Sequence, residues 1–340
     1  MLIVYDEEYT RHLARVNHPE APDRVRTVAE RLRAEGMLDE CVRPRRATPD
    51  ELALVHPAAY VDRVRREVEK LAESHRVSYL STGDTVIDES SFDVAATAAG
   101  GVLVAAERVA EERRAAFALV RPPGHHAEPA RGMGFCVFNN AGLAARAFSL
   151  RTGAPSLIVD FDYHHGNGSQ AIVGSGVSYV SSHASPAYPG TGSAAENRYD
   201  PSGAIVNFPL PASGYDTEAF VALWEEVLRS LARALHPGLI VASAGYDFVA
   251  GDPVGDLGIA PQASSSLGRM IRCVAEEYCE GRALFVLEGG YDPKVLADCV
   301  VATIRSYESD EDELGTPSPG AIPQRERAIL NRMHAAFESR

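Results

Sequence analysis

The sequence predicts a single doubly wound α/β domain built on a parallel sheet. Short apolar runs rich in β-branched residues recur along the chain, and stretches with helical periodicity lie between them. The runs are continuous and not alternating, which is typical of parallel strands buried on both faces. Regular alternation of strand and helix favours one α/β domain over separate α and β units.

The elements follow from these two patterns. We predict strands at 2–5, 117–120, 156–159, 177–180, 239–242 and 283–287. The main helices are predicted at 22–35, 57–74, 91–113, 140–150, 216–235 and 262–280. Five segments rich in polar residues or glycine follow predicted strands: 121–140, 161–169, 183–215, 245–259 and 288–293. Ligands bind at the carboxyl ends of strands in such sheets, so these segments are expected to carry the site.

The end of the chain differs in composition from the rest. Residues 306–320 are acidic and rich in proline and serine, as in a linker. A last helix is predicted at about 322–338. We therefore expect a catalytic domain over 1–306, and an acidic linker and a helix over 307–340. That helix is expected to pack on the domain or against a partner.

Composition limits the classes of function. The 340 residues include 47 acidic and 33 basic side chains, a net charge of −14. This balance argues against direct nucleic-acid binding and favours cationic partners such as lysine-rich peptides or polyamines. The alternative is that the excess of acid only keeps the protein soluble. Five cysteines without a C-x-x-C pair indicate neither a disulfide framework nor a thiolate zinc site. With no leader or membrane span in the sequence, we expect a cytoplasmic protein.

The segment DFDYHHGNG (160–168) directly follows a predicted strand. Asp160, Asp162 and His164 alternate along it, so on an extended segment they point to one side. Two carboxylates and an imidazole at the end of a sheet suit Zn²⁺, with Fe²⁺ as the alternative. A polar loop that caps the next helix would explain one aspartate, but burying several ionisable groups without a metal is costly.

Three further features follow predicted strands. His125 and His126, after a Pro-Gly turn, are interpreted as acid–base groups. Asp247, after LIVAS, is a candidate third metal ligand. Tyr291 follows two glycines, which would let the backbone approach a ligand, although a packed tyrosine in a turn is the alternative. The solitary histidines are predicted to be structural: those at 12, 18, 56, 75, 236 and 334.

With these residues in place, the chain resembles the histone deacetylase superfamily, which includes acetylpolyamine amidohydrolases and acetoin-utilisation proteins. The matching motifs are RPPGHHA (121–127), GFCVFNN (134–140), VDFDYHHGNG (159–168), SSHASPAYPGTG (181–192), AGYDFVAGDP (244–253) and LEGGYD (287–292), with HPEAPDRV (18–25) upstream. They occur in the family's order. LEGGY, and Asn167 where other branches carry Asp, resemble the class II branch.

The resemblance implies an arginase-like fold with a central eight-stranded parallel sheet. By position, it makes Asp162, His164 and Asp247 the zinc ligands and Tyr291 the catalytic tyrosine. Gly134, Phe135, Tyr188 and Val254 would form the acyl tunnel and its gate, and Asp84 a rim residue that grips the substrate backbone. An inner K⁺ or Na⁺ site would use Asp160, Asp162, His164, Ser181 and Ser182.

The chemistry expected of these residues is hydrolysis of an acyl amide. Three protein ligands leave an open metal position, where zinc lowers the pKa of bound water. His126 is the expected general base and then acid, oriented by Asn167. His125, paired with Asp160, supports it, and Tyr291 donates to the oxyanion.

Several alternatives stay open from the sequence. An arginase-type dimetal hydrolase needs another carboxylate at the position of Gly166, which disfavours it. A catalytically inactive acyl-binding module is disfavoured because the ligands, both histidines and Tyr291 are retained. Acetyl-lysine in a protein or peptide and acetylated polyamine both remain candidate substrates. Val254 at the gate cannot bind a second ammonium, which favours acyl-lysine. Oligomerisation also remains open.

Overall fold

Eight parallel strands form the central sheet, as the sequence analysis predicted. The computed structural model describes residues 1–340 except 40, 73–75, 201, 310–319 and 339–340. In spatial order the strands are β2 (Cys41–Val42), β1 (Leu2–Val4), β5 (Ala116–Ala118), β10 (Ala283–Leu287), β9 (Leu239–Ala244), β6 (Ser156–Asp160), β7 (Val177–Ala184) and β8 (Ile205–Leu210). A separate antiparallel pair joins β3 (Ser78–Tyr79) to β4 (Val86–Ile87).

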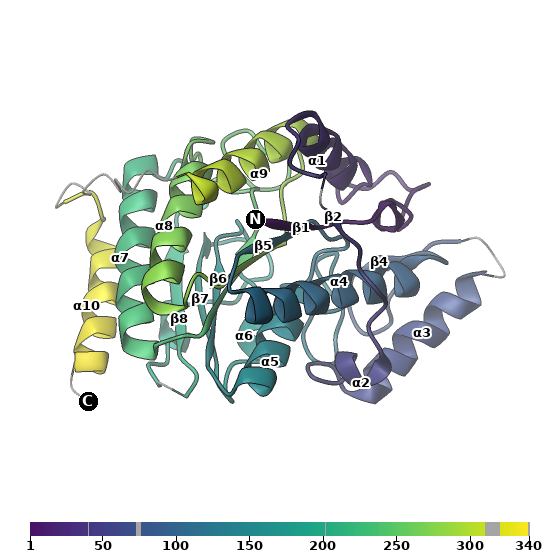
Figure 1. Ribbon diagram of the computed structural model, residues 1–340, viewed down its shortest axis with the longest axis horizontal. Coiled ribbons are helices and arrows are strands. Elements are labelled where there is room, and N and C mark those ends of the chain that lie inside the picture. Colours follow the sequence, from purple (N-terminus) through teal and green to yellow (C-terminus); the bar gives the residue numbers. More distant parts are fainter. Residues whose placement is uncertain (40, 73–75, 201, 310–319, 339–340) are drawn as a thin grey trace.

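Helices cover both faces of this sheet, which makes a three-layer α/β domain (Figure 1). One layer contains α1 (Asp23–Ala34), α7 (Thr217–Leu235), α8 (Ala263–Tyr278) and α9 (Pro293–Glu308). The opposite layer contains α4 (Ser91–Glu112) and α5 (Asn140–Thr152), with α2 (Pro49–Leu52), α3 (Ala58–Ala72) and α6 (Asn167–Ala171) beside them. None of the described helices combines the length and apolar composition that a membrane span requires.

Burial on both faces explains why the central strands are continuous apolar runs. Every residue of β10 is inaccessible to solvent. Phe285 of that strand stacks on Phe117 of β5, with ring centroids 5.8 Å apart. Removing such a side chain from water contributes about 1.5–3 kcal/mol, so a run of five strongly favours the centre of the sheet.

Two sequence predictions about the elements were wrong. The segment 183–215 was predicted as one long loop, but it contains the end of β7 and all of β8. Asn207 and Pro209 interrupt the apolar run of β8, and the proline is tolerated because β8 is an edge strand. The linker-like segment was predicted to begin at 306, but α9 continues to Glu308.

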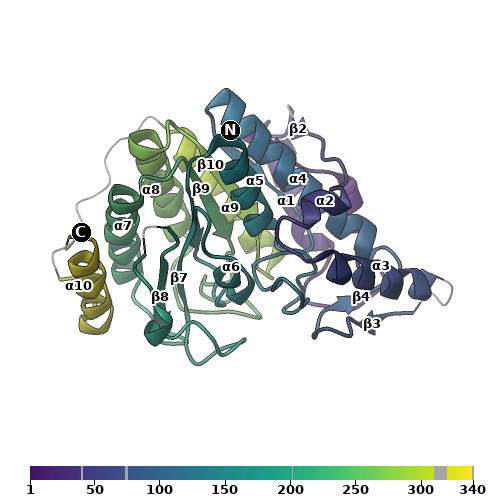
Figure 2. The same cartoon turned by 90° about the horizontal axis from the view of Figure 1, so that it is seen from below.

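The last helix, α10 (Gln324–Glu338), lies beside α7 (Figure 2). Arg327 forms an ion pair with Glu226 at 2.6 Å, and the His334 ring is 2.9 Å from the Ser230 hydroxyl. Residues 310–319, which make up most of the predicted acidic linker, lie outside the described residues.

The register of the central strands positions the site. Asp160, the last residue of β6, pairs with Ser243 of β9 on one side and Ser181 of β7 on the other. The loops that follow β5, β10, β9 and β6 therefore meet at one edge of the sheet.

Candidate active site

Two carboxylates and one imidazole form the only group of potential metal ligands found in the described part of the chain. Asp162 and His164 come from the loop after β6, and Asp247 comes from the loop after β9. One ligand atom of each lies within 4.8 Å of the others. The Nδ1 atom of His164 is 3.2 Å from Asp162 Oδ1 and 3.0 Å from Asp247 Oδ2. The strand itself ends at Asp160 and the chain then bends, so a bend and not the predicted strand pleat brings Asp162 and His164 together.

Backbone amides and small residues fix the two carboxylates. Gly289 N–H donates to Asp162 Oδ2 at 2.8 Å, and Tyr163 N–H donates to Asp247 Oδ1 at 2.9 Å. A Cβ on Gly289 would lie 2.6 Å from Asp162 Oδ2, and a Cβ on Gly245 would overlap the same carboxylate. These glycines are therefore required for the backbone to approach Asp162.

The charge of the site favours a bound cation. Four of its carboxylates are completely or almost completely buried, those of Asp160, Asp162, Asp247 and Glu288. Burial acts to lower the pKa of His164, yet hydrogen bonds to Asp162 and Asp247 outweigh it and raise that pKa to about 10. A pocket that stabilises positive charge this strongly, lined by carboxylate oxygens and an imidazole nitrogen, fits a divalent transition metal.

The two adjacent histidines have different partners. His125 Nδ1 is 3.1 Å from the Asp160 carboxylate, whereas His126 Nδ1 is 2.8 Å from the Asn167 side-chain oxygen. Burial opposes a charged His125, but Asp162 and Asp160 outweigh it and raise its pKa well above the ordinary value. Burial, reinforced by the His125 imidazole, lowers the pKa of His126 well below its ordinary value. His126 is thus suited to accept a proton at neutral pH, and His125 to remain charged.

Glu288 supports the histidine loop, a role that the sequence analysis did not assign. Its Oε2 atom accepts from the backbone N–H of Gly124 at 2.7 Å and of His125 at 3.1 Å. The preceding strand β10 lies next to β5, which leads into the histidine loop. The position of Glu288 directly after a buried strand was the signal that could have indicated this contact.

A cavity of about 380 Å³ opens onto these groups. Its lining includes His126, His164, Tyr291 and all five predicted substrate residues, Asp84, Gly134, Phe135, Tyr188 and Val254. His125 is not among the lining residues, and its ring centroid lies 4.1 Å from that of His126. Three further residues, His18, Tyr79 and Val86, were not predicted.

His18 corrects one of the sequence predictions. It was assigned a structural role, but it lines the cavity with its ring 4.7 Å from the Phe135 ring. Its place in HPEAPDRV, the upstream part of the resemblance, was the available signal. The predicted structural residue His75 lies outside the described residues.

The walls of the cavity are aromatic and joined at the rim. Phe135 adopts φ +69°, a conformation that places its ring 6.0 Å from the Tyr291 ring. The Asp84 carboxylate accepts from the Tyr188 hydroxyl at 3.0 Å and from Gly134 N–H at 2.9 Å. The rim aspartate therefore holds together the two segments that carry the aromatic walls.

The residues predicted for a monovalent cation lie at the ends of β6 and β7. Asp160 and Ser181 are register partners, and the Asp160 carboxylate also accepts from the Tyr179 hydroxyl at 3.0 Å. The Ser181 hydroxyl is 2.9 Å from His183 Nδ1, while the Ser182 hydroxyl accepts from Trp224 Nε1 at 3.1 Å. Strand pairing thus brings Asp160 and Ser181 side by side, and the Ser182 side chain contacts α7.

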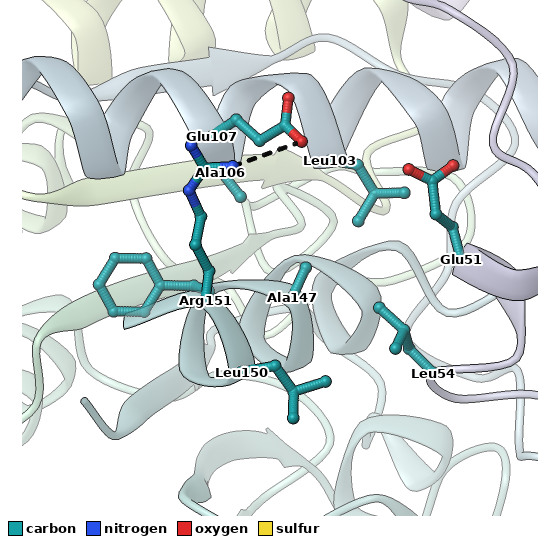
Figure 3. A pocket seen from close by; sticks show the side chains of 9 residues that line it. Glu51, Leu54, Leu103, Ala106, Glu107, Ala147, Leu150 and Arg151 are labelled. Carbon is teal, nitrogen blue, oxygen red and sulfur yellow. Dashed lines mark ion pairs between the residues drawn. The ribbon is translucent and has the colours of Figure 1, made fainter. Parts of the chain in front are cut away.

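A second cavity, of about 330 Å³, lies elsewhere, between α2 and the carboxyl-terminal halves of α4 and α5 (Figure 3). Its charged groups form ion pairs: Arg151 with Glu107 at 3.8 Å, and Glu51 with Arg45 at 2.6 Å. Leu54, Leu103 and Leu150 supply apolar surface. None of the candidate metal ligands lines it, so the catalytic assignment stays with the first cavity.

Comparisons with known proteins agree with this geometry. A family model described as "Histone deacetylase domain" matches residues 18–307. "Histone deacetylase 15" of Arabidopsis thaliana is 36% identical over 320 residues, 90% of this chain and 56% of the relative. A "Probable deacetylase" of Archaeoglobus fulgidus is 35% identical over 298 residues, 85% of this chain and 80% of the relative. The chain thus spans little more than half the length of the plant relative.

A solved structure shares the fold over nearly the whole chain. The crystal structure of the HDA15 HD domain superposes with a TM-score of 0.86 at 32% identity, covering 99% of this chain and 95% of that one. The family model covers most of the chain, and its matched range includes the candidate metal ligands, both adjacent histidines and Tyr291. By sequence and by fold, the chain belongs to the histone deacetylase family.

Proposed function

We propose that this protein is a zinc-dependent deacetylase that hydrolyses the acetyl amide of acetyl-lysine in a protein or peptide. One observation carries the proposal: a cavity with aromatic walls reaches His164, one of three clustered side chains that could hold a metal ion, and also has His126 and Tyr291 on its lining. Membership of a deacetylase family supports the reaction type.

Asp162, His164 and Asp247 would hold the ion. A bound zinc ion would supply an activated water and a polarised acyl carbonyl. A single metal is favoured over an arginase-type pair because the described residues contain one ligand group. A side chain on Gly166, where a second metal would need a carboxylate, would overlap Asp160. Fe²⁺ shares the preference for these ligands and remains the alternative metal.

The remaining steps fall to the protein's own groups. The Asn167 side-chain oxygen accepts the Nδ1 proton of His126, which leaves Nε2 unprotonated to take a proton from the attacking water. The same nitrogen then gives the proton to the departing amine. His125, kept charged by Asp162 and Asp160, lies beside His126 with ring centroids 4.1 Å apart. The Tyr291 hydroxyl donates to the developing oxyanion.

The mouth of the cavity favours a peptide over a small polyamine. Tyr79 is 66% exposed and Tyr188 is 39% exposed, and both line the cavity. Val254 at the gate carries no charge. Among the described residues, Asp84 is the one carboxylate on the lining, and it already accepts hydrogen bonds from Tyr188 and Gly134. Aromatic rings suit the methylenes of a lysine stem and apolar neighbours in a peptide, whereas the described lining offers a second ammonium no carboxylate besides Asp84.

We also propose an inner K⁺ or Na⁺ ion near Asp160 and Ser181, with carbonyl oxygens of Asp162, His164 and Ser182. The register that pairs Asp160 with Ser181 supports it, since it brings oxygen atoms together behind the metal ligands.

The test is a panel of acyl-lysine peptides and acetylpolyamines, with and without a chelator, combined with metal analysis. We expect acetyl-lysine peptides to be hydrolysed, one transition metal per chain, and loss of activity on chelation that added zinc restores. Asp247→Ala should remove both metal and activity, whereas Asp256→Asn, in the same loop but outside the site, should keep both. No hydrolysis of any acyl amine by metal-loaded protein would refute the proposal.

A further inference from the structure

The carboxylate of Asp252 joins two loops of the candidate site. Its Oδ2 atom accepts from the backbone N–H of Tyr291 at 2.6 Å and of Asp292 at 3.3 Å. Its Oδ1 atom accepts from the backbone N–H of Val254 at 3.0 Å and of Gly255 at 3.1 Å. One side chain therefore satisfies amides from the loop after β9 and from the loop after β10.

These two loops carry different parts of the cavity lining. Val254 lies at the gate, and Tyr291 supplies the hydroxyl proposed for the oxyanion. The loop after β9 also folds back on itself at Gly255. A Cβ on Gly255 would overlap the backbone carbonyl of Asp247, a candidate metal ligand. Asp252 thus links the backbone of Tyr291 to the loop that carries Asp247, and it helps to set the distance between Tyr291 and the candidate metal ligands.

A second contact holds the tyrosine loop from the other side. Arg24 Nε donates to the carbonyl of Gly290 at 2.6 Å, and its guanidinium lies 4.8 Å from the centre of the Tyr291 ring. Arg24 thus holds a carbonyl and the ring, whereas Asp252 holds the amide. Hydrogen bonds from amides to a carboxylate are about twice as strong as neutral ones, so losing Asp252 would release the Tyr291 amide, whereas Gly289 would stay bonded to Asp162.

We propose that Asp252 is a positioning residue that sets Tyr291 for catalysis and at the same time fixes the Val254 gate. This inference rests on the proposed deacetylase function. Asp252 does not touch the reacting atoms, and it acts through the backbone of Tyr291. Placement errors of this kind are costly because an oxyanion donor must lie within hydrogen-bond distance of the developing charge.

The chain offers a matched control in the same loop. Asp256 also accepts two backbone hydrogen bonds, from Gly251 at 3.0 Å and Gly258 at 2.8 Å, but both are local to its own loop. Asp256→Asn therefore removes a loop carboxylate without touching the tyrosine loop.

The test is a double-mutant cycle between Asp252→Asn and Tyr291→Phe, measured with an acetyl-lysine peptide. We expect Asp252→Asn to lower kcat at least 10-fold in the unmutated background and less than 3-fold in the Tyr291→Phe background, because the donor is already absent there. Asp256→Asn should change kcat less than 3-fold. Metal content should stay unchanged in all variants.

A second readout does not depend on activity. Hydrogen–deuterium exchange of the Tyr291 and Asp292 amides should become at least 10-fold faster in Asp252→Asn and stay unchanged in Asp256→Asn. Equal losses of kcat in both backgrounds, or unchanged exchange, would overturn the positioning role. An unmutated protein that hydrolyses no acyl amine would instead refute the deacetylase function, and the exchange result would still decide whether Asp252 orders the loop.

Discussion

The Nδ1 atom of His126 lies 2.8 Å from the side-chain oxygen of Asn167, so this imidazole donates its proton to a neutral amide. Its neighbour His125 donates instead to the carboxylate of Asp160. The same residue type therefore has two electrostatic environments in one loop. The carboxylates near His125 stabilise its imidazolium, whereas the Asn167 amide fixes the tautomer of His126 and does not offset the burial that lowers the pKa of His126.

Replacing the amide by a carboxylate should move the pH dependence of activity. In Asn167→Asp, a negative acceptor would face Nδ1 of His126 and raise the pKa of this residue. Since the base must be unprotonated, the acidic limb of the kcat/KM profile should shift to higher pH by about one unit or more. Steady-state kinetics from pH 5 to pH 9 provide the measurement.

The effect of the neighbouring Glu128 must be separated from that of the substitution at Asn167. The Asn167 amide donates to Glu128 Oε1 at 2.8 Å, so the new carboxylate would also face Glu128. The pair Asn167→Asp with Glu128→Gln removes that repulsion, and Glu128→Gln alone provides its baseline. An acidic limb that stays in place in the correctly folded double variant would show that His126 is not the base.

The hydroxyl of Tyr291 is predicted to act only in the transition state. Tyr291→Phe keeps the ring that packs against Phe135 and Arg24, so folding and metal content should be retained. Loss of one oxyanion donor should lower kcat by roughly 10²–10³ with little change in KM. Near-native turnover would remove the hydroxyl from the mechanism.

The parts of the fold that could be predicted are those with one dominant physical cause. Burial on both faces requires an uninterrupted apolar run, and β10 was therefore predicted with its observed bounds. Strand β8 was missed because an edge strand tolerates Asn207 and Pro209. Helix α9 was missed although Asp292 caps it and Pro293 begins it, which are recognisable start signals.

The candidate site divides in the same way. Residues that directly follow buried strands, such as Asp162 and Asp247, are placed by the topology of the sheet and could be predicted from their position. His18 and Tyr79 reach the cavity from an N-terminal segment and a small hairpin, and no strand order dictates where these lie. The role of Asp252 was not predicted, because its contacts are with backbone amides of two loops. Such contacts produce no recognisable pattern of residues in the sequence.

Buried neutral histidines should make the protein sensitive to acid. Burial lowers the pKa of His56 to about 4. Its Nδ1–H donates to the Pro129 carbonyl at 3.0 Å, while Nε2 accepts from Asn139 N–H at 2.8 Å, so protonation would break the second bond. Between pH 6.5 and pH 4 the unfolded chain binds a proton that the folded chain does not. Stability should therefore fall as pH falls through this window, by roughly 2 kcal/mol from pH 7 to pH 5 for this residue.

Urea unfolding at pH 7 and pH 5 provides the measurement. His56→Gln cannot gain a proton, so its loss of stability between the two pH values should be smaller than that of the unmutated protein. The exposed His236, which ends α7 at φ +45°, offers a control, and His236→Asn suits that conformation. Equal pH dependence in all three proteins would contradict the assignment.

The gate residue Val254 should decide between peptide and polyamine substrates. It lines the cavity and its backbone is held by Asp252, so a substitution changes the side chain at a fixed position. Two effects oppose each other, because the net charge of −14 attracts any polycation at long range while a valine offers no partner to a second ammonium. Salt separates them, since long-range attraction is screened beyond about 8 Å at physiological ionic strength.

We expect kcat/KM for acetyl-lysine peptides to exceed that for acetylspermidine at physiological ionic strength. Val254→Glu should narrow the gap, and Val254→Gln, of similar size but uncharged, should not. If the unmutated protein prefers acetylspermidine at high salt, recognition of the second ammonium must come from another acidic side chain near the mouth.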